Sequence, residues 1–218
     1  MTEGDERAFA GGPVAREARS FSRYGRHVIR LGAEVPRRLE RRRLLARLPK
    51  HALCAEIGTW RGDFAETILR SRHPRTLHLI DPWEHRGEDA YERALFGGGA
   101  LDGQGEMDAI YDGVLQRFRS AIESGQVKVR RSRSVEAAAD FPDESLDWVY
   151  IDGDHTYEAV KADLAAYARA VKPGGLLAGD DYGLAGWWGD GVTRAVDEFA
   201  ANARLTIIGT QFLLEKPS

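Results

Sequence analysis

At the centre of the chain stands the stretch Leu146-Asp147-Trp148-Val149-Tyr150-Ile151-Asp152-Gly153-Asp154-His155. An apolar run typical of a buried strand ends here in two carboxylates, a glycine and an imidazole. A second strand-like run, residues 175–179, ends in Asp180 and Asp181, 28 residues after Asp152. If the two runs are neighbouring parallel strands, these acids meet at the carboxyl edge of one sheet, where open α/β sheets bind their ligands.

Carboxylate oxygens gathered at a sheet edge suit a hard divalent cation such as Mg²⁺ or Mn²⁺. The alternative for each acid is structural, because Asp and Gly also punctuate strand ends without binding anything. Two acidic strand ends in one chain, with His155 beside the first, favour a metal site over two unrelated turns.

The composition is that of a soluble globular protein with one main domain, since 43% of the 218 residues are hydrophobic and 30% are charged. A single cysteine, Cys54, excludes an internal disulfide and any multi-cysteine zinc site. The polar N-terminus lacks the apolar segment of a signal peptide, and no apolar run approaches the ~18 residues of a membrane span. We therefore expect a cytoplasmic protein without a membrane partner.

Charge is unevenly distributed along the chain, whose net charge is −3. Residues 1–50 hold twelve Arg and one Lys against six acids, a net charge of +7, so the remainder carries −10. No nucleic-acid motif follows this basic segment, and nucleic acid is not expected as a partner. We interpret 1–50 as a helical arm or lid with a solvated Arg face and 51–218 as the main domain; a homodimer, if formed, is expected to use the arm. A helix opening at Pro36 is expected to bury Leu39, Leu44, Leu45 and Leu48.

Strand-like and helix-like patterns alternate from residue 51 onward, which predicts an α/β fold. The strand–helix–strand unit over residues 52–81 should have parallel strands. The last two strands are separated only by Gly209-Thr210 and should pair antiparallel. We expect a Rossmann-like three-layer sandwich, with a mostly parallel seven-stranded sheet, an antiparallel edge strand and the N-terminal helical arm. The predicted strands are 52–57, 76–80, 127–129, 146–151, 175–179, 205–208 and 211–214.

The first predicted strand leads into a glycine-containing turn, Glu56-Ile57-Gly58-Thr59-Trp60-Arg61-Gly62. Glycines there let the backbone approach a ligand closely, and tight packing is the alternative reason for them. The spacing departs from the G-x-G-x-x-G of dinucleotide sites, and the acid at the entry would repel a pyrophosphate. Asp81 ends the next strand, where a carboxylate can accept hydrogen bonds from two ribose hydroxyls. These features favour a nucleoside cofactor without phosphates over NAD.

Several short motifs occur in order: the glycine turn, Asp81-Pro82-Trp83, Asp152-Gly153-Asp154-His155, Lys172-Pro173-Gly174-Gly175 and Asp180-Asp181-Tyr182. In this order they resemble a class I S-adenosylmethionine-dependent methyltransferase. Within that class, the chain is similar to the metal-dependent O-methyltransferases of the macrocin O-methyltransferase type, which methylate sugar hydroxyls. The resemblance covers roughly residues 51–200 and leaves the arm at 1–50 uncovered.

The resemblance implies a cofactor site along these motifs. The glycine turn would face the amino-acid part of S-adenosylmethionine, Asp81 would hold the ribose, and Ser134 with Val135 would lie at the adenine. The implied cofactor-binding residues are Glu56, Gly58, Thr59, Trp60, Gly62, Asp81, Ser134 and Asp152.

The same resemblance implies Asp152, Asp180 and Asp181 as metal ligands and either Asp154 or His155 as the base. A sugar hydroxyl hardly ionises at neutral pH, and coordination to a divalent ion lowers the pKa of a bound hydroxyl by several units. Imidazole is the commonest general base near neutral pH, which makes His155 the first choice and Asp154 the second. Helix capping is the alternative role for both residues.

Three aromatic residues follow the second acidic motif: Tyr182, Trp187 and Trp188. Exposed rings there would stack on the apolar face of a sugar, and core packing is the alternative. We expect methylation of a hydroxyl on a sugar or glycosylated small molecule. One rival function is methylation of a catechol-like phenol, which chelates a metal through two oxygens. Another is a protein that holds S-adenosylmethionine without turnover, although cofactor binding alone needs no acid cluster.

Overall fold

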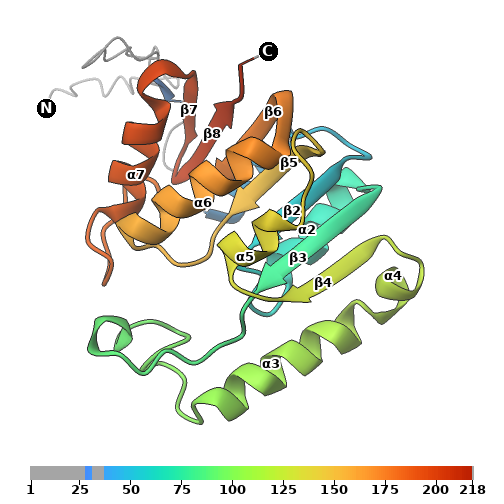
Figure 1. Cartoon of the computed structure of the whole chain (residues 1–218), viewed down its shortest axis with the longest axis vertical. Coiled ribbons are helices and arrows are strands. Elements are labelled where there is room, and N and C mark those ends of the chain that lie inside the picture. The colour runs from blue at the N-terminus through green and yellow to red at the C-terminus, as the bar shows by residue number, and fades with distance from the viewer. Residues whose placement is uncertain (1–27, 31–36, 218) are drawn as a thin grey trace, which may run out of the picture.

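The computed structural model describes residues 28–30 and 37–217. Its strands are β1 (Val28–Arg30), β2 (Leu53–Ile57), β3 (Thr76–Asp81), β4 (Val127–Arg131), β5 (Leu146–Ile151), β6 (Val171–Gly179), β7 (Leu205–Ile208) and β8 (Gln211–Glu215). The described residues form one eight-stranded sheet in the order β1-β7-β8-β6-β5-β2-β3-β4 (Figure 1). Neighbouring strands are parallel except for β8, which runs antiparallel to both β6 and β7.

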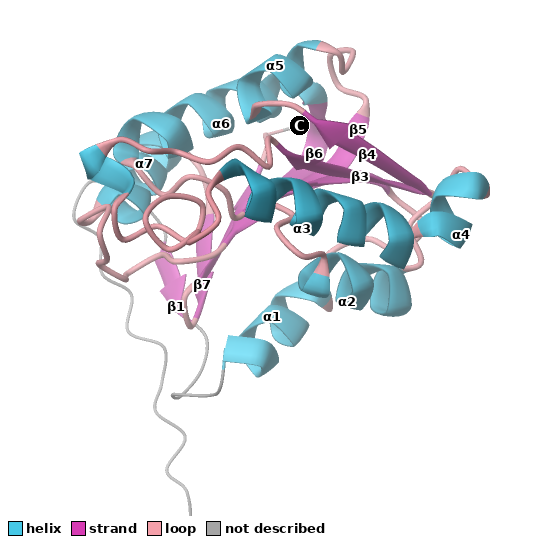
Figure 2. Ribbon diagram, turned by 90° about the horizontal axis from the view of Figure 1, so that it is seen from below, coloured by secondary structure: helices cyan, strands magenta, loops and turns pink. Residues whose placement is uncertain are grey.

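Helices cover both faces of the sheet, and each layer buries its own apolar cluster (Figure 2). On one face, Val160, Leu164 and Tyr167 recur at helical spacing and pack against the sheet. On the other face, Ile68 and Met107 belong to the second cluster. The first layer holds α5 (Ser134–Ala139), α6 (Tyr157–Ala170) and α7 (Gly191–Phe199); the second holds α1 (Arg37–Leu45), α2 (Asp63–Arg72), α3 (Gln104–Arg117) and the short α4 (Arg119–Glu123). Within the described ranges, no helix combines the length and the apolar character needed to cross a membrane.

Strands β2 to β8 confirm the seven-stranded, mostly parallel sheet predicted from the sequence. The antiparallel strand is β8, which forms the predicted hairpin with β7 and lies between β7 and β6. An eighth strand, β1, pairs in parallel with β7 and falls inside the segment predicted as a helical arm. The rest of that arm, at 1–27 and 31–36, lies outside the described residues.

Helix α1 is built into the fold by its docking on the β7–β8 hairpin. The carboxylate of Glu40 is buried and accepts hydrogen bonds from Thr210 N at 3.1 Å and Thr210 Oγ1 at 3.3 Å. A side chain at Gly209 would overlap this carboxylate, so glycine is needed at the turn. Leu44 and Leu45 are buried as predicted, whereas Leu39 is 38% exposed because it lies off the docked face. The docking directs the arginine face of α1 toward the carboxyl edge of the sheet.

Candidate functional site

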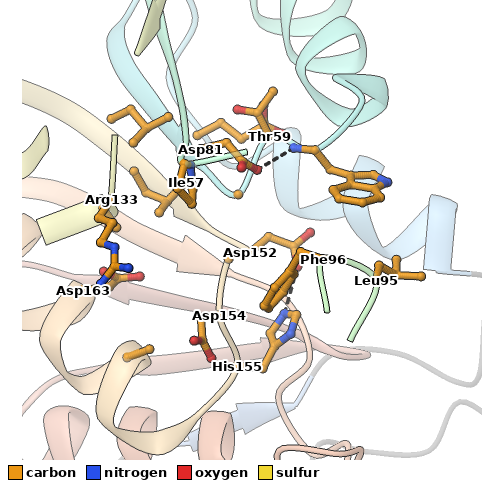
Figure 3. Close-up of a pocket in the computed structure, with 18 of the residues that line it drawn as sticks. Ile57, Thr59, Asp81, Leu95, Phe96, Arg133, Asp152, Asp154, His155 and Asp163 are labelled. Carbon is orange, nitrogen blue, oxygen red and sulfur yellow. Dashed lines mark hydrogen bonds and ion pairs between the residues drawn. The ribbon is translucent and has the colours of Figure 1, made fainter. Parts of the chain in front are cut away.

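A cavity of 890 Å³ lies at the carboxyl edge, where the parallel neighbours β3, β2 and β5 all end. The turn after β2, the end of β3, the loop after β5 and the first residues of α5 all line it. The connection between β3 and α3 contributes Leu95 and Phe96, so this long segment forms part of the cavity wall (Figure 3). Apart from Asp180 and Gly62, the predicted acids and the predicted glycine turn therefore line one cavity.

The glycine turn packs directly on the end of β5. Gly58 has a φ of +84°, in the left-handed region, and a Cβ there would overlap the backbone of Asp152 and Gly153. Gly58 N donates to Ile80 O at 2.9 Å, and Asp152 N donates to Ile57 O at 2.8 Å. Glycine is required here both for the backbone conformation and for the close approach of two strand ends.

Gly58→Ala is therefore expected to lower the free energy of unfolding by at least about 3 kcal/mol, because left-handed strain and backbone overlap add together. Gly113→Ala in α3 is the matched control, since a Cβ there meets no atom within 4 Å. Ala in place of an interior helical Gly should stabilise the fold by about 1 kcal/mol. Urea unfolding measures both changes, and equal stability of the two variants would contradict the structure of the turn.

Asp81 ties the glycine turn to the connection after β3. Its Oδ2 accepts a hydrogen bond from Trp60 N at 2.9 Å, and its Oδ1 accepts one from Trp83 N at 2.8 Å. Burial raises the pKa of the Asp81 carboxyl, and these two backbone donors oppose the rise. Each oxygen keeps a second lone pair, so the carboxylate can still accept two further hydrogen bonds from a ligand.

Buried polar atoms without a hydrogen-bond partner concentrate at this cavity. Of the six such side-chain atoms among the described residues, four belong to cavity-lining residues. Burial and the neighbouring Asp152 carboxylate raise the pKa of Glu56 well above its usual value. Since buried polar groups are normally paired, this concentration indicates that the cavity takes a polar ligand. The four atoms are Glu56 Oε2, Thr59 Oγ1, Ser134 Oγ and Trp188 Nε1.

Three of the predicted catalytic and metal-binding residues converge on the wall of the cavity. Asp152, His155 and Asp181 each offer one ligand atom, and these atoms all lie within 4.8 Å of one another. His155 Nε2 lies 3.1 Å from Asp181 Oδ2 and 3.4 Å from Asp152 Oδ1. Asp181 has a φ of 62°, a left-handed turn that brings its side chain back toward the end of β5.

Two arginines of α1 complete this cluster, and the sequence analysis missed both. Arg41 Nη2 lies 2.6 Å from Asp152 Oδ2 and 2.7 Å from Asp180 Oδ2, so one guanidinium bridges two strand ends. Arg37, one turn earlier, pairs with Asp181. The arginine face of α1 is thus directed at the acids instead of being wholly solvated. Their i, i+4 spacing was the only signal in the sequence, and it is shared by many solvated helices.

Asp180, predicted as a metal ligand, does not line the cavity. Its side chain is fully buried, and its two oxygens already accept five hydrogen bonds. The donors are Arg41 (Nε and Nη2), Thr210 Oγ1, Gln211 Nε2 and the backbone N–H of Asp181. This carboxylate therefore anchors α1 and β8 at the edge of the cluster, and Asp152 and Asp181 are left to face the cavity.

Asp154 lines the cavity but uses both oxygens to hold backbone and loop in place. Its Oδ1 accepts a hydrogen bond from Thr156 N at 2.9 Å, at the start of α6, and its Oδ2 accepts one from Tyr91 Oη at 2.8 Å. The structural alternative considered for this residue matches the geometry. His155 is the freer of the two predicted bases.

The predicted substrate-binding aromatics divide into two groups. Tyr182 is buried in the core, where its hydroxyl donates to Asp197 Oδ1 at 3.0 Å, and it does not line the cavity. Trp187 and Trp188 do line it, and the Trp188 ring lies 4.7 Å from the His155 ring. Phe96 also lines the cavity and lies 6.0 Å from the Trp187 ring, and Tyr91 supports Trp187 from outside the lining at a ring distance of 5.2 Å. Both come from the long connection, whose loop sequence carried no periodic signal.

Comparison with known proteins identifies the domain. The model of the family described as "Methyltransferase domain" matches residues 55–182, which is more than half of the chain. No curated protein matches the chain in sequence.

Solved structures share the fold at low sequence identity. The N-methyltransferase NodS from Bradyrhizobium japonicum is 14% identical, with 83% of this chain and 97% of that chain covered and a TM-score of 0.54. SMU.1697c from Streptococcus mutans, solved in complex with SAH, is 12% identical, with coverage of 85% and 99% and a TM-score of 0.55. Precorrin-6y C5,15-methyltransferase from Geobacter metallireducens is 14% identical, with coverage of 82% and 87% and a TM-score of 0.54. With a matching family model over most of the sheet, the chain belongs to the methyltransferase-domain family.

Proposed function

We propose that this chain transfers a methyl group from S-adenosylmethionine to a hydroxyl of a sugar or glycosylated small molecule, with the help of Mg²⁺ or Mn²⁺. The convergence of Asp152, His155 and Asp181 at the wall of the cavity carries this proposal. That cavity also holds the glycine turn and Asp81, so the proposed acceptor and cofactor sites adjoin. Transfer needs the acceptor oxygen in line with the methyl group, which this adjacency allows.

The residues present fit S-adenosylmethionine. Asp81 has lone pairs left for two ribose hydroxyls, and the unpartnered Glu56 Oε2 and Thr59 Oγ1 lie at the turn proposed to face the amino-acid part. Ser134 Oγ, also unpartnered, lies at the start of α5, where the adenine is proposed to sit. A polar nucleoside ligand would thus satisfy atoms that the folded chain leaves unpaired.

The acid cluster fits a divalent cation through Asp152 and Asp181. Mg²⁺ in proteins is commonly held by one or two carboxylates, with water and substrate oxygens filling its other positions. Arg41 holds Oδ2 of Asp152, and Arg37 holds Oδ1 of Asp181. The other oxygen of each carboxylate would then be the one available to the ion. When bound there, the ion would lower the pKa of the acceptor hydroxyl.

His155 is the proposed base. Its Nε2 faces both Asp181 and Asp152. In the tautomer protonated on Nδ1, and with the two carboxylates engaged by the ion, this nitrogen would accept the hydroxyl proton. The two carboxylates stabilise the imidazolium that forms. Trp188 packs beside the His155 ring and restricts water around it. Trp187 offers a face on which the apolar side of a sugar can stack.

A catechol-like phenol is the second candidate acceptor. The aromatic wall formed by Phe96, Trp187 and Trp188 favours it, because a flat aromatic ring packs on such a wall as readily as a sugar does. The same acids would serve the same chemistry on a phenolic hydroxyl.

Asp81→Ala is expected to weaken binding of S-adenosylhomocysteine by roughly 1–3 kcal/mol, because two ribose hydroxyls lose their acceptor. That corresponds to about 5- to 150-fold in Kd. Titration calorimetry measures the change, with circular dichroism as a check on the fold. Asp112→Ala, at an exposed position of α3, is the control and should bind as the wild type does. Unchanged affinity in Asp81→Ala would remove Asp81 from the cofactor site.

A methyl-transfer screen over sugars, glycosides and catechols, run with and without EDTA, tests the proposed function. Turnover of a glycoside or sugar that stops with EDTA and returns with Mg²⁺ is the expected result. Preference for catechols would favour the second candidate. Binding of S-adenosylmethionine without transfer to any hydroxyl would contradict both.

A further inference from the structure

One part of the cavity wall, called the slot below, is largely apolar and includes a single buried acid, Asp163. Ile80 at the end of β3 and Val135 on α5 line the slot, together with three residues of α6. Those three, Ala159, Ala162 and Asp163, are spaced i, i+3 and i+4, so they share one face of the helix. Two alanines leave a shallow wall against which a flat ring can pack, with Asp163 at its end.

Asp163 is 4% exposed and still borders the cavity. Figure 3 shows it at the side of the pocket away from His155 and Leu95. The Ser134 hydroxyl lies close enough to Asp163 to oppose the effect of burial on its pKa. By strict distance and angle, however, Ser134 Oγ makes no hydrogen bond with any described residue. A buried acid and a buried hydroxyl thus face the slot, and neither is fully satisfied by the chain.

Burial raises the pKa of Asp163 to about 7, and the Asp154 carboxylate adds to the rise. Among the described residues, only the Ser134 hydroxyl opposes the effect of burial on this carboxyl. A buried acid with so little compensation is unfavourable for the fold, so its presence needs a reason. Whether protonated or ionised, the group offers an oxygen acceptor toward the slot. A ligand with an N–H donor on a flat, otherwise apolar ring would match both the walls and the acid.

We propose that Asp163 recognises the base of the cofactor by accepting a hydrogen bond from the exocyclic amine of adenine. This inference rests on the cofactor assignment in the proposed function and adds a residue from α6 to the cofactor site. Asp81 is the residue after Ile80, so a ribose held by Asp81 would present its base to the slot. Asp163 is then a specificity-determining residue, because a base without the amine would leave its oxygen unpaired.

The test combines two ligands with two variants in titration calorimetry. The ligands are S-adenosylhomocysteine and its counterpart with purine in place of adenine, which lacks only the amine. Asp163→Asn keeps an oxygen acceptor, whereas Asp163→Leu removes it. Urea unfolding checks the fold, and Asp163→Leu should be at least as stable as the wild type because it no longer buries an acid. Glu158→Gln, at an exposed position on the same helix, is the control.

We expect the wild type, Asp163→Asn and the control to bind the adenine ligand roughly 5- to 100-fold more tightly than the purine ligand, the range for one buried hydrogen bond. Asp163→Leu should lose affinity for the adenine ligand and most of that preference. The proposal is overturned if Asp163→Leu keeps the wild-type preference, whether or not both affinities fall together. A wild type that binds neither ligand would overturn the cofactor assignment as well. Binding with the expected preference but no transfer to any hydroxyl would leave Asp163 in place and refute only the acceptor.

Discussion

His155→Ala is expected to lower kcat on the order of 10²- to 10⁴-fold, the usual range for losing a general base. His155 Nε2 is the proposed proton acceptor, and it lies 3.1 Å from Asp181 Oδ2. Affinity for S-adenosylhomocysteine should stay near that of the wild type, because the proposed ribose contacts are made by Asp81 on another strand. Steady-state kinetics with an acceptor from the screen, together with calorimetry, separate the two effects.

Asp154→Ala is the comparison that assigns the base. Asp154 accepts hydrogen bonds from the backbone at the start of α6 and from Tyr91. Its loss should therefore lower the free energy of unfolding, whereas kcat per folded molecule should change little. If Asp154→Ala is folded but inactive and His155→Ala is nearly as active as the wild type, the base is Asp154 and not His155.

Asp181→Asn is expected to abolish both turnover and the binding of Mn²⁺ followed by electron paramagnetic resonance. The substitution removes one of only two proposed ligand carboxylates. Affinity for the ion should therefore fall by more than the roughly 10- to 100-fold that is typical when a residue hydrogen-bonded to a metal ligand is lost. Arg37 would lose its pair with Asp181 but keep Asp180 at 3.5 Å, and Arg37 is largely exposed, so the effect on stability should be small.

Asp180→Asn is the matched variant, one residue away and different in its expected outcome. Asp180 is fully buried and holds the Arg41 guanidinium. Loss of its charge should lower the free energy of unfolding on the order of 3 kcal/mol, the low end for breaking a buried pair, because Arg41 keeps Asp152. Mn²⁺ should still bind to the folded fraction. Full activity of EDTA-treated enzyme would contradict the proposed metal site. The acids would then be neutralised by Arg37 and Arg41 alone.

The strands, and the meeting of the glycine turn with Asp81 at one sheet edge, could be predicted because their signals are local. Apolar runs of strand length, the glycine turn and Asp81 at a strand end are all read within a few residues. Parallel pairing of adjacent strands then places Asp81 and Asp152 at one edge.

The residues that surround the acids could not be predicted because their contacts are long-range. Arg41 meets Asp180 across 139 positions of sequence, and which face of an arginine-rich helix docks depends on Glu40 and the β7–β8 hairpin. Composition alone made that face look solvated. Similarly, Asp180 and Asp181 look equivalent in sequence, and only the left-handed conformation at Asp181 separates their roles.

Product analysis with labelled S-adenosylmethionine tests the proposed function most directly. With Mg²⁺ and an acceptor from the screen, the wild type should yield an O-methyl ether and S-adenosylhomocysteine in equal amounts, with the label located on a hydroxyl oxygen by nuclear magnetic resonance. EDTA or His155→Ala should remove the ether. A label found on nitrogen or carbon, or transfer at the full rate without a divalent ion, would contradict it.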